Sequence, residues 1–185
     1  MRIRTLTRRQ LIQTGAAAAI GAVAAPASLI AGPRDRSELP RSLAFFALHT
    51  GEHLKTTYWS DGEYLAPALD NINYLLRDHR ANEVKSIDVS LLNLLERLHR
   101  QLDTRQPFHV ISGYRTAATN AILNARSEGV ARHSLHMEGM AIDIRVPDRR
   151  LPTLRRAATA LHGGGVGYYP RSDFVHVDVG RVRYW

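Results

Sequence analysis

Three residues of types that bind metal ions lie in two short motifs near the carboxyl end of the chain. Residues 134–143 read SLHMEGMAID and place His136 and Asp143 seven positions apart. Residues 174–180 read FVHVDVG and supply a second histidine, His176. Zinc accepts imidazole nitrogen and carboxylate oxygen as ligands, and three protein ligands with a fourth position left to water are typical of a catalytic site. The two motifs therefore indicate a metal-dependent hydrolase.

The elements around these residues would turn their side chains toward one point. Gly139 lies between the first two candidate ligands and permits a backbone turn that other residues disfavour. Asp143 has an isoleucine on either side in a predicted strand, so it faces away from both. His176 and Asp178 lie two positions apart in another predicted strand and therefore share a face. A lone histidine on a strand is usually a hydrogen-bonded core residue. A shared metal ion, in contrast, explains why the histidines and aspartates of both motifs occur together.

Apolar spacing predicts helices early in the chain and a cluster of strands late. A hairpin is expected where residues 42–49 and 54–59 flank a Thr-Gly-Glu turn. Leucines at helical spacing and start signals predict helices over residues 65–80, 88–102, 117–127 and 151–162. Short apolar runs predict strands over residues 108–112, 139–146, 166–169 and 173–179. This order favours an α+β fold with a small antiparallel sheet flanked by helices.

The amino end has the pattern of an export signal. Arg8 and Arg9 precede residues 14–31, which are rich in Ala, Gly and Val and contain no charge. Two small-residue triplets within that run, AVA and APA, resemble cleavage sites. The arginine pair indicates export by the twin-arginine translocation machinery. A membrane anchor is the alternative, and it is disfavoured because the run lacks the leucine and isoleucine density of a stable span.

Composition agrees with an exported single domain. A signal over residues 1–31 and a linker over residues 32–41 leave residues 42–185, which are enough for one core. The absence of cysteine excludes disulfides and thiolate ligands. The formal charge is +8, but residues 1–27 hold four of the 25 basic residues and no acid, which leaves 21 basic against 17 acidic residues. This mild excess of basic residues suits an anionic cell wall. It is too small for a typical nucleic-acid-binding domain, and no nucleic-acid recognition motif is present.

The combined motifs resemble those of the LAS-type zinc peptidases of cell walls. That group includes D-alanyl-D-alanine carboxypeptidases, phage endolysins and the zinc fold of hedgehog domains. The resemblance rests on the pattern SxHxxGxAxD over residues 134–143 and on the later strand that carries His176. Over roughly residues 40–185 the chain is similar to the YcbK-like murein endopeptidases, through the segments LAFFALHTGE, SGYRT and FVHVDVGRVRYW and the twin-arginine leader.

The resemblance implies an activity and leaves alternatives to it. A zinc ion held by His136, Asp143 and His176 would serve a periplasmic endopeptidase that hydrolyses peptide cross-links of peptidoglycan. No stable membrane span is expected in the mature chain. One alternative is a D,D-carboxypeptidase that trims stem peptides. The other is a zinc-stabilised module that binds the wall without turnover.

The resemblance also implies residues that bind the substrate. Arg115 and Ser134 are expected to contact carboxylate or carbonyl groups of the wall peptide, and the planar guanidinium of Arg115 suits a carboxylate. Tyr114 and Tyr168 are candidates for an aromatic rim that orients the peptide. His133 lies outside the motif pattern and is interpreted as a surface residue or a neighbour of the ligands.

Two aspartates are candidates for the proton acceptor, and Asp178 is preferred to Asp173. Hydrolysis needs a carboxylate that takes a proton from the attacking water. Strand alternation favours Asp178, on the face of His176, whereas the resemblance favours Asp173, three positions before that histidine. Asp173 would qualify if the chain bends at residues 170–172 before the strand begins. Glu138, in the turn between the first two ligands, is a third and weaker candidate.

Overall fold

The computed structural model describes residues 39–126 and 129–185. The predicted signal and residues 32–38 of the predicted linker lie outside the described residues. The described strands are β1 (Arg41–Ala47), β2 (His53–Ser60), β3 (Glu63–Tyr64), β4 (Phe108–Ser112), β5 (Ala141–Arg145), β6 (Gly165–Tyr169), β7 (Phe174–Asp178) and β8 (Arg183–Tyr184). The described helices are α1 (Ala66–Leu75), α2 (Val89–Leu102), α3 (Ala117–Arg126), the 3-10 helix η3 (Leu135–Glu138) and α4 (Leu151–Ala160). The predicted α+β class is confirmed.

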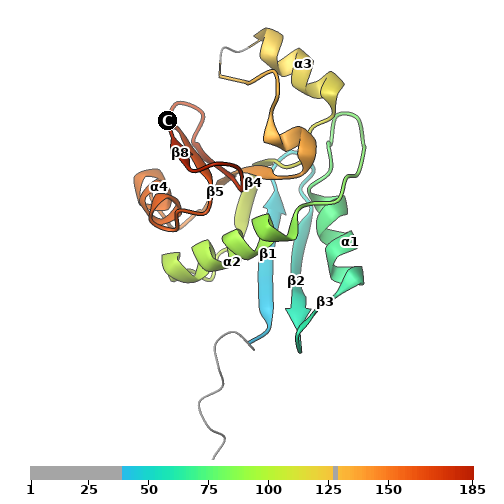
Figure 1. Ribbon diagram of the computed structural model, residues 1–185, viewed down its shortest axis with the longest axis vertical. Helices are drawn as coiled ribbons and strands as arrows, with labels where there is room; N and C mark the ends of the chain where they lie inside the picture. Colours follow the sequence, from blue (N-terminus) through green and yellow to red (C-terminus); the bar gives the residue numbers. More distant parts are fainter. Residues whose placement is uncertain (1–38, 127–128) are drawn as a thin grey trace, which may run out of the picture. The chain divides into compact units, whose positions relative to one another are not determined.

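The strands form one mixed sheet in the order β3-β2-β1-β4-β5-β7-β6-β8 (Figure 1). The predicted antiparallel sheet is correct for most neighbours and wrong at two of them, because β1–β4 and β6–β8 are parallel. The first parallel pair is possible because β2, β3, α1 and α2 lie between the two strands and form a long crossover. The second arises because β7 reverses the direction of β6, so that the chain returns along β6 as β8.

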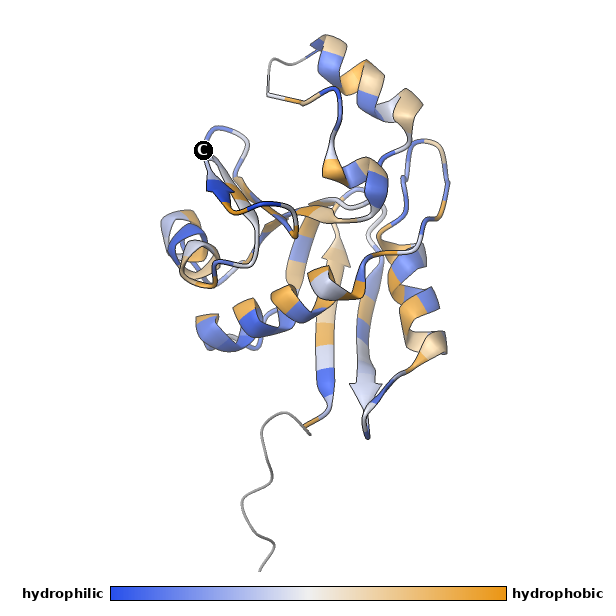
Figure 2. Ribbon diagram, viewed as in Figure 1, coloured by the Kyte–Doolittle hydropathy of each residue, from blue (hydrophilic) through white to orange (hydrophobic). Residues whose placement is uncertain are grey.

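Three helices pack on the sheet through their apolar sides. Helix α1 contacts β2, α2 contacts β1 and α4, and α4 contacts β6 and β7. Figure 2 shows apolar and polar residues alternating along α1 and α2, as one-sided burial requires. The core between these layers includes Leu91, Leu92, Leu95, Leu98, Ile142, Ile144, Val175 and Val177. Strands β5 and β7 therefore turn their aliphatic residues to the core and their polar residues to the other face.

Within residues 39–126 and 129–185, no helix is long and apolar enough to cross a membrane.

Helix α2 begins after Asp88, whose carboxylate accepts a hydrogen bond from the Ser90 N–H at 2.7 Å. Of the two start signals in the sequence, Asp88 is thus the residue that caps the helix.

Helix α1 ends at Leu75 rather than at Arg80, where the leucine spacing predicted its end. The next residues bind elsewhere in the fold. The Leu76 carbonyl accepts a hydrogen bond from the Tyr114 N–H at 2.8 Å, and the buried Asp78 carboxylate accepts one from the Thr116 N–H at 2.9 Å. Because these contacts replace helical ones, residues 76–83 leave the helix and dock on the segment that precedes α3.

Three short elements, β3, η3 and β8, were not predicted. Each has two to four residues, which is too short to display a period of 2.0 or 3.6. The other predicted boundaries differ from the structure by a few residues at most. Of the three short elements, η3 matters most for the site because it carries one of the candidate ligands.

Candidate metal centre

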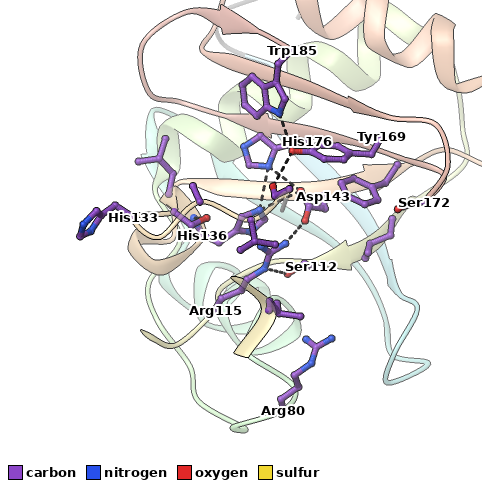
Figure 3. A pocket seen from close by; sticks show the side chains of 18 of the residues that line it. Arg80, Ser112, Arg115, His133, His136, Asp143, Tyr169, Ser172, His176 and Trp185 are labelled. Atoms are coloured by element: carbon purple, nitrogen blue, oxygen red, sulfur yellow. Dashed lines mark hydrogen bonds and ion pairs between the residues drawn. The ribbon is translucent and has the colours of Figure 1, made fainter. Parts of the chain in front are cut away.

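His136, Asp143 and His176 come together on the sheet face opposite the core. His136 lies in η3, and the antiparallel register of β5 and β7 places Asp143 directly beside His176. Their exposed fractions are 1%, 2% and 8%, and one ligand atom from each lies within 4.8 Å of the other two. Figure 3 shows the three side chains directed at one another. The structure therefore brings together the three residues that the sequence predicted as metal ligands.

The local structure of η3 aims His136 at the sheet. The Ser134 hydroxyl accepts a hydrogen bond from the His136 N–H at 3.4 Å and so begins the helical turn. Gly139 ends the turn with a φ of 70°, in the left-handed region that favours glycine. A Cβ at Gly139 would lie 2.4 Å from the Ser86 carbonyl oxygen. The turn predicted at Gly139 thus needs glycine both for its dihedral angle and for space.

Hydrogen bonds at the outer edge of each ring decide which nitrogen faces the cluster. Nδ1 of His136 donates to the Gly113 carbonyl oxygen at 2.7 Å, because a carbonyl can only accept. Nε2 of His176 donates to Oδ2 of Asp178 at 3.0 Å. In a neutral ring the other nitrogen carries no proton. Nε2 of His136 and Nδ1 of His176 therefore present lone pairs to the carboxylate of Asp143.

These three inward atoms have the spacing and chemistry of a metal site. Nε2 of His136 lies 3.2 Å from both Oδ1 of Asp143 and Nδ1 of His176, and the last two atoms are 2.9 Å apart. Ligands of a tetrahedral zinc with bonds of about 2.0–2.1 Å are separated by about 3.3 Å. Lone pairs that face one another at this spacing repel unless a proton or a metal cation lies between them. The residues therefore fit a divalent metal ion.

The atoms of the cluster that face away from this point have partners of their own. Arg115 forms an ion pair with Oδ2 of Asp143, and its Nε donates to the Ser112 hydroxyl at 2.7 Å. Asp178 is fully buried, and Arg183 donates to both of its oxygens, at 3.1 and 2.7 Å. Outer contacts of this kind fix ring tautomers and ligand orientation in metal sites.

Burial and these contacts also shift the pKa values of the cluster. Burial lowers the pKa of His136, which keeps its ring neutral and able to bind a metal. Burial alone would raise the pKa of Asp143, but its contacts with both histidines and Arg115 lower it below the usual range. For His176, the effect of burial is outweighed by the carboxylates of Asp143 and Asp178, which raise the pKa. The cluster thus holds an ionised carboxylate beside its imidazoles.

The candidate proton acceptors lie outside the pocket. Oδ1 of Asp178 accepts hydrogen bonds from the N–H groups of Gly165 and Gly180, at 3.0 and 2.9 Å, and from Arg183, while Oδ2 meets His176 and Arg183. Asp173 has a side chain that is 61% exposed and pairs with Arg145 at 2.6 Å. Glu138 pairs with Lys85 at 3.5 Å. Among the described residues that line the pocket, Asp143 has the single carboxylate side chain.

A pocket of about 320 Å³ opens beside the cluster. Arg115 and Ser134, the predicted substrate-binding residues, line it, and so does the exposed His133. Tyr114 does not: its ring is half-buried and packs against the core. Tyr168 lies over Arg155, at another depression of the surface.

The aromatic wall of the pocket is formed instead by Tyr169, Phe174 and Trp185. The indole of Trp185 lies 5.4 Å from the His176 ring and donates to the Tyr169 hydroxyl at 2.8 Å. Sequence reasoning missed Trp185 because it follows β7 without belonging to either histidine motif. For the tyrosines a signal was available. Side chains alternate along a strand, so only one of Tyr168 and Tyr169 can share the face of His176.

Comparison with known proteins agrees with this geometry. A family model described as peptidoglycan L,D-endopeptidase MepK, of the Peptidase_M15_2 type, matches residues 35–185. The chain is 43% identical over 181 residues to the peptidoglycan L,D-endopeptidase MepK of Escherichia coli strain K12, a match that covers 96% of each chain. It is 40% identical over 147 residues to the probable peptidoglycan L,D-endopeptidase MepK of Haemophilus influenzae, with 79% of each chain covered.

Proposed function

Because the chain belongs to the peptidoglycan L,D-endopeptidase MepK family, we propose that it hydrolyses peptide cross-links of the bacterial cell wall with zinc at His136, Asp143 and His176. The observation that carries the proposal is the convergence of three ligand atoms beside a pocket. Two imidazoles and a carboxylate favour zinc in a chain without thiolates. When bound, zinc would polarise the scissile carbonyl and lower the pKa of water.

Asp178 is proposed to position His176 rather than to accept the proton. Both of its oxygens already accept hydrogen bonds, and the side chain is fully buried. A base must have a lone pair within reach of the attacking water. The carboxylate instead holds the proton on Nε2 of His176 and leaves Nδ1 free for the metal. The sequence-based preference for Asp178 as the base is therefore replaced by a positioning role.

The second candidate base, Asp173, lies in a different environment from Asp178. The chain turns before β7, and Asp173 has a φ of 54°, so the bend that its candidacy required is present. Its partner Arg145 lies two positions after Asp143 on β5 and therefore on the same face of the sheet. Proton transfer by Asp173 would require its carboxylate to leave Arg145 and turn toward the pocket. We propose that it stays paired at the rim.

Arg115 is proposed to serve both the metal ligand and the substrate. Its Nε and Nη2 hold Ser112 and Asp143, while Nη1 has no hydrogen-bond partner among the described residues. That remaining nitrogen lies on a pocket-lining side chain and is suited to a carbonyl or carboxylate of the wall peptide. Ser134 caps η3 and presents its hydroxyl at the same pocket.

The place of action follows from the substrate. Peptidoglycan stem peptides lie outside the cytoplasmic membrane, so we propose that the protein works in the periplasm. The arginine pair and apolar run of residues 1–31 support export by the twin-arginine machinery. No nucleic-acid partner is proposed, because the acidic and basic residues of the domain are nearly balanced.

Digestion of purified peptidoglycan by the metal-loaded protein, followed by mass analysis of the muropeptides, tests the activity and the bond together. We expect cross-linked muropeptides to disappear. His136→Ala should abolish cleavage and lower the bound metal measured by elemental analysis, because it removes one of three ligands. His53→Ala, which changes an exposed histidine on β2, is the matched control and should retain both properties.

Two outcomes would contradict the proposal in different ways. Release of free D-alanine with cross-links intact would indicate a D,D-carboxypeptidase. Wall binding that is equal in the wild type and His136→Ala, with no cleavage by either protein, would indicate a non-catalytic module.

A further inference from the structure

Arg80 is a cation at the wall of the pocket, and no acidic side chain among the described residues pairs with it. The other two arginines of the pocket are neutralised, Arg115 by Asp143 and Arg183 by Asp178. In the described part of the chain, the Arg80 guanidinium has no hydrogen bond and no ion pair. Figure 3 shows it on the same side of the cavity as Arg115. An exposed arginine is common, but one facing a substrate pocket without a counter-ion offers a site for an anion.

The backbone that carries Arg80 is fixed by a buried carboxylate. Oδ1 of Asp78 accepts a hydrogen bond from the Arg80 N–H at 3.0 Å. Oδ2 of the same carboxylate accepts from both the N–H and the hydroxyl of Thr116, each at 2.9 Å. Asp78 is 1% exposed, and Thr116 directly follows Arg115 in the chain. One buried side chain therefore ties the backbone of Arg80 to the backbone beside Arg115.

This anchoring fixes the backbone position from which the Arg80 side chain extends at the pocket. The Leu76 carbonyl accepts the Tyr114 N–H at 2.8 Å and adds a second attachment between the same two segments. Preorganised donors bind an anion better than flexible ones, because less conformational freedom is lost on binding. The loop that bears Arg80 is thus built as part of the pocket and not as a free surface turn.

We infer that Arg80 binds a free carboxylate of the wall peptide and that Asp78 is the residue that positions it. The inference deepens the proposed function and rests on it, since the ligand is the substrate of that site. A planar guanidinium can hold both oxygens of a carboxylate at once. Among the described residues that line the pocket, the one acidic side chain is Asp143, and Arg115 and the two histidines already hold it.

Two synthetic cross-linked wall peptides test this inference, one with its carboxylates free and the other with the same groups converted to carboxamides. Wild-type protein should cleave the free acid with the higher kcat/KM. Arg80→Gln should lower kcat/KM for the free acid about 10- to 100-fold, mainly through KM, because one charge-assisted contact is lost. The same variant should cleave the amide within about twofold of the wild type. The preference for the acid therefore disappears.

The controls separate a specific effect from a general one. Arg105→Gln removes an exposed arginine outside the pocket and should leave both rates unchanged. Arg80→Lys keeps the charge but not the fork, so it should restore part of the preference. Equal losses on both peptides in Arg80→Gln, or no preference in the wild type, would overturn the inference. Failure of the wild type to cleave either peptide would instead overturn the proposed function.

Asp78→Asn tests the positioning role. It should reduce the preference for the free acid in the same direction as Arg80→Gln while the bound metal stays unchanged. In an Arg80→Gln background it should have no further effect on that preference, because the two residues act through one contact. A preference that survives in Asp78→Asn would show that the buried carboxylate does not position Arg80.

Calorimetric titration of a non-cleavable free-acid peptide gives a readout that does not depend on turnover. Arg80→Gln should weaken that binding about 10- to 100-fold and leave the affinity for the amide unchanged. Equal affinities of the wild type and Arg80→Gln for the acid would overturn the inference.

Discussion

The surroundings of the candidate metal centre and the rim of its pocket use similar charged residues in opposite ways. Beside the cluster, the Asp178 side chain is fully buried and both of its oxygens accept several hydrogen bonds. At the rim, Asp173 is 61% exposed, and its described contact is one ion pair with Arg145, itself 38% exposed. Two aspartates that lie five positions apart thus differ in burial and in the number of their hydrogen-bond partners.

The difference in burial indicates which region can hold ligands in a fixed geometry and which can contact a substrate. Breaking a buried charge pair leaves an uncompensated charge and costs about 3–5 kcal/mol, whereas an exposed pair contributes about 0–1 kcal/mol. The buried contacts therefore fix the ligand geometry that a metal needs. The rim can exchange partners with little loss of stability, which suits residues that meet a substrate.

Asp178→Asn is expected to have the largest effect on this comparison. The asparagine keeps an acceptor for Nε2–H of His176 but loses the charge that pairs with Arg183. Loss of such an outer partner typically lowers metal affinity about 10- to 100-fold. Competition with a fluorescent chelator would measure it, and turnover should fall in parallel and recover at high metal concentration.

Asp148→Asn is the matched control, because this carboxylate also pairs with an arginine, whereas it makes no hydrogen bond to any of the three candidate ligands. It should leave metal affinity unchanged. If Asp178→Asn binds metal like the wild type yet does not turn over at any metal concentration, Asp178 takes part in the chemistry and the positioning role is wrong.

Gly167→Ala tests the aromatic wall between the cluster and the rim. A Cβ at Gly167 would lie 2.7 Å from the Trp185 indole, so the ring must shift from its place beside His176. Overpacking of this kind costs about 1–3 kcal/mol. Urea denaturation should show that loss, and KM for the wall peptide should rise because the pocket wall is displaced.

A double variant identifies the indole as the cause. In a Trp185→Ala background the methyl group has room, so Gly167→Ala should cost less than about 0.5 kcal/mol there. An undiminished cost in that background would mean that strain in β6, and not the ring, explains the effect.

The sequence predicted the parts of the fold that repeat a pattern. The leucines of α2 recur at helical spacing and the valines of β7 alternate, and both elements lie within a residue of their predicted bounds. The end of α1 could not be predicted in the same way. It depends on Asp78 binding Thr116, which is 38 positions away in the chain. No local sequence pattern predicts a contact between residues that lie so far apart in the chain.

The candidate site shows the same division. Residue type and strand parity predicted the cluster and the shared face of His176 and Asp178, whose side chains lie 3.0 Å apart. Parity says which face a side chain occupies but not which atoms its oxygens meet. The contacts of Asp178 with Arg183 and the backbone of Gly165 come from β8 and the start of β6. That arrangement appears only when the sheet is assembled.

Asp78→Asn measures how much stability a buried carboxylate outside the cluster provides. Burial would raise the pKa of Asp78, but hydrogen bonds from Thr119, Thr116 and the Arg80 N–H lower it to about 2. A lowered folded-state pKa stabilises the protein above the unfolded value of 3.8, and this contribution is lost as the pH falls toward 2. Asp78→Asn should therefore lose about 2 kcal/mol at pH 7.

Urea denaturation from pH 7 to pH 2 would check this expectation. The difference between the wild type and Asp78→Asn should shrink between pH 4 and pH 2, because Asp78 becomes protonated over this range, first in the unfolded chain and then, near pH 2, in the folded protein. Asp70→Asn, at an exposed position of α1, should match the wild type throughout. A difference that stays constant with pH would assign the effect of Asp78 to packing and not to charge.

Asp173→Asn is expected to have the smallest effect and gives the sharpest test of the rim. Its pair with Arg145 is exposed, so the free energy of unfolding should change by less than about 1 kcal/mol. Arg145→Gln removes the same pair from the other side and should match it. If Asp173 stays paired as proposed, both variants keep their metal and most of their turnover. Loss of turnover in Asp173→Asn alone, with metal and stability intact, would mean that its carboxylate leaves Arg145 during the reaction and accepts the proton, so an exposed rim residue would perform the chemistry that the buried Asp178 cannot.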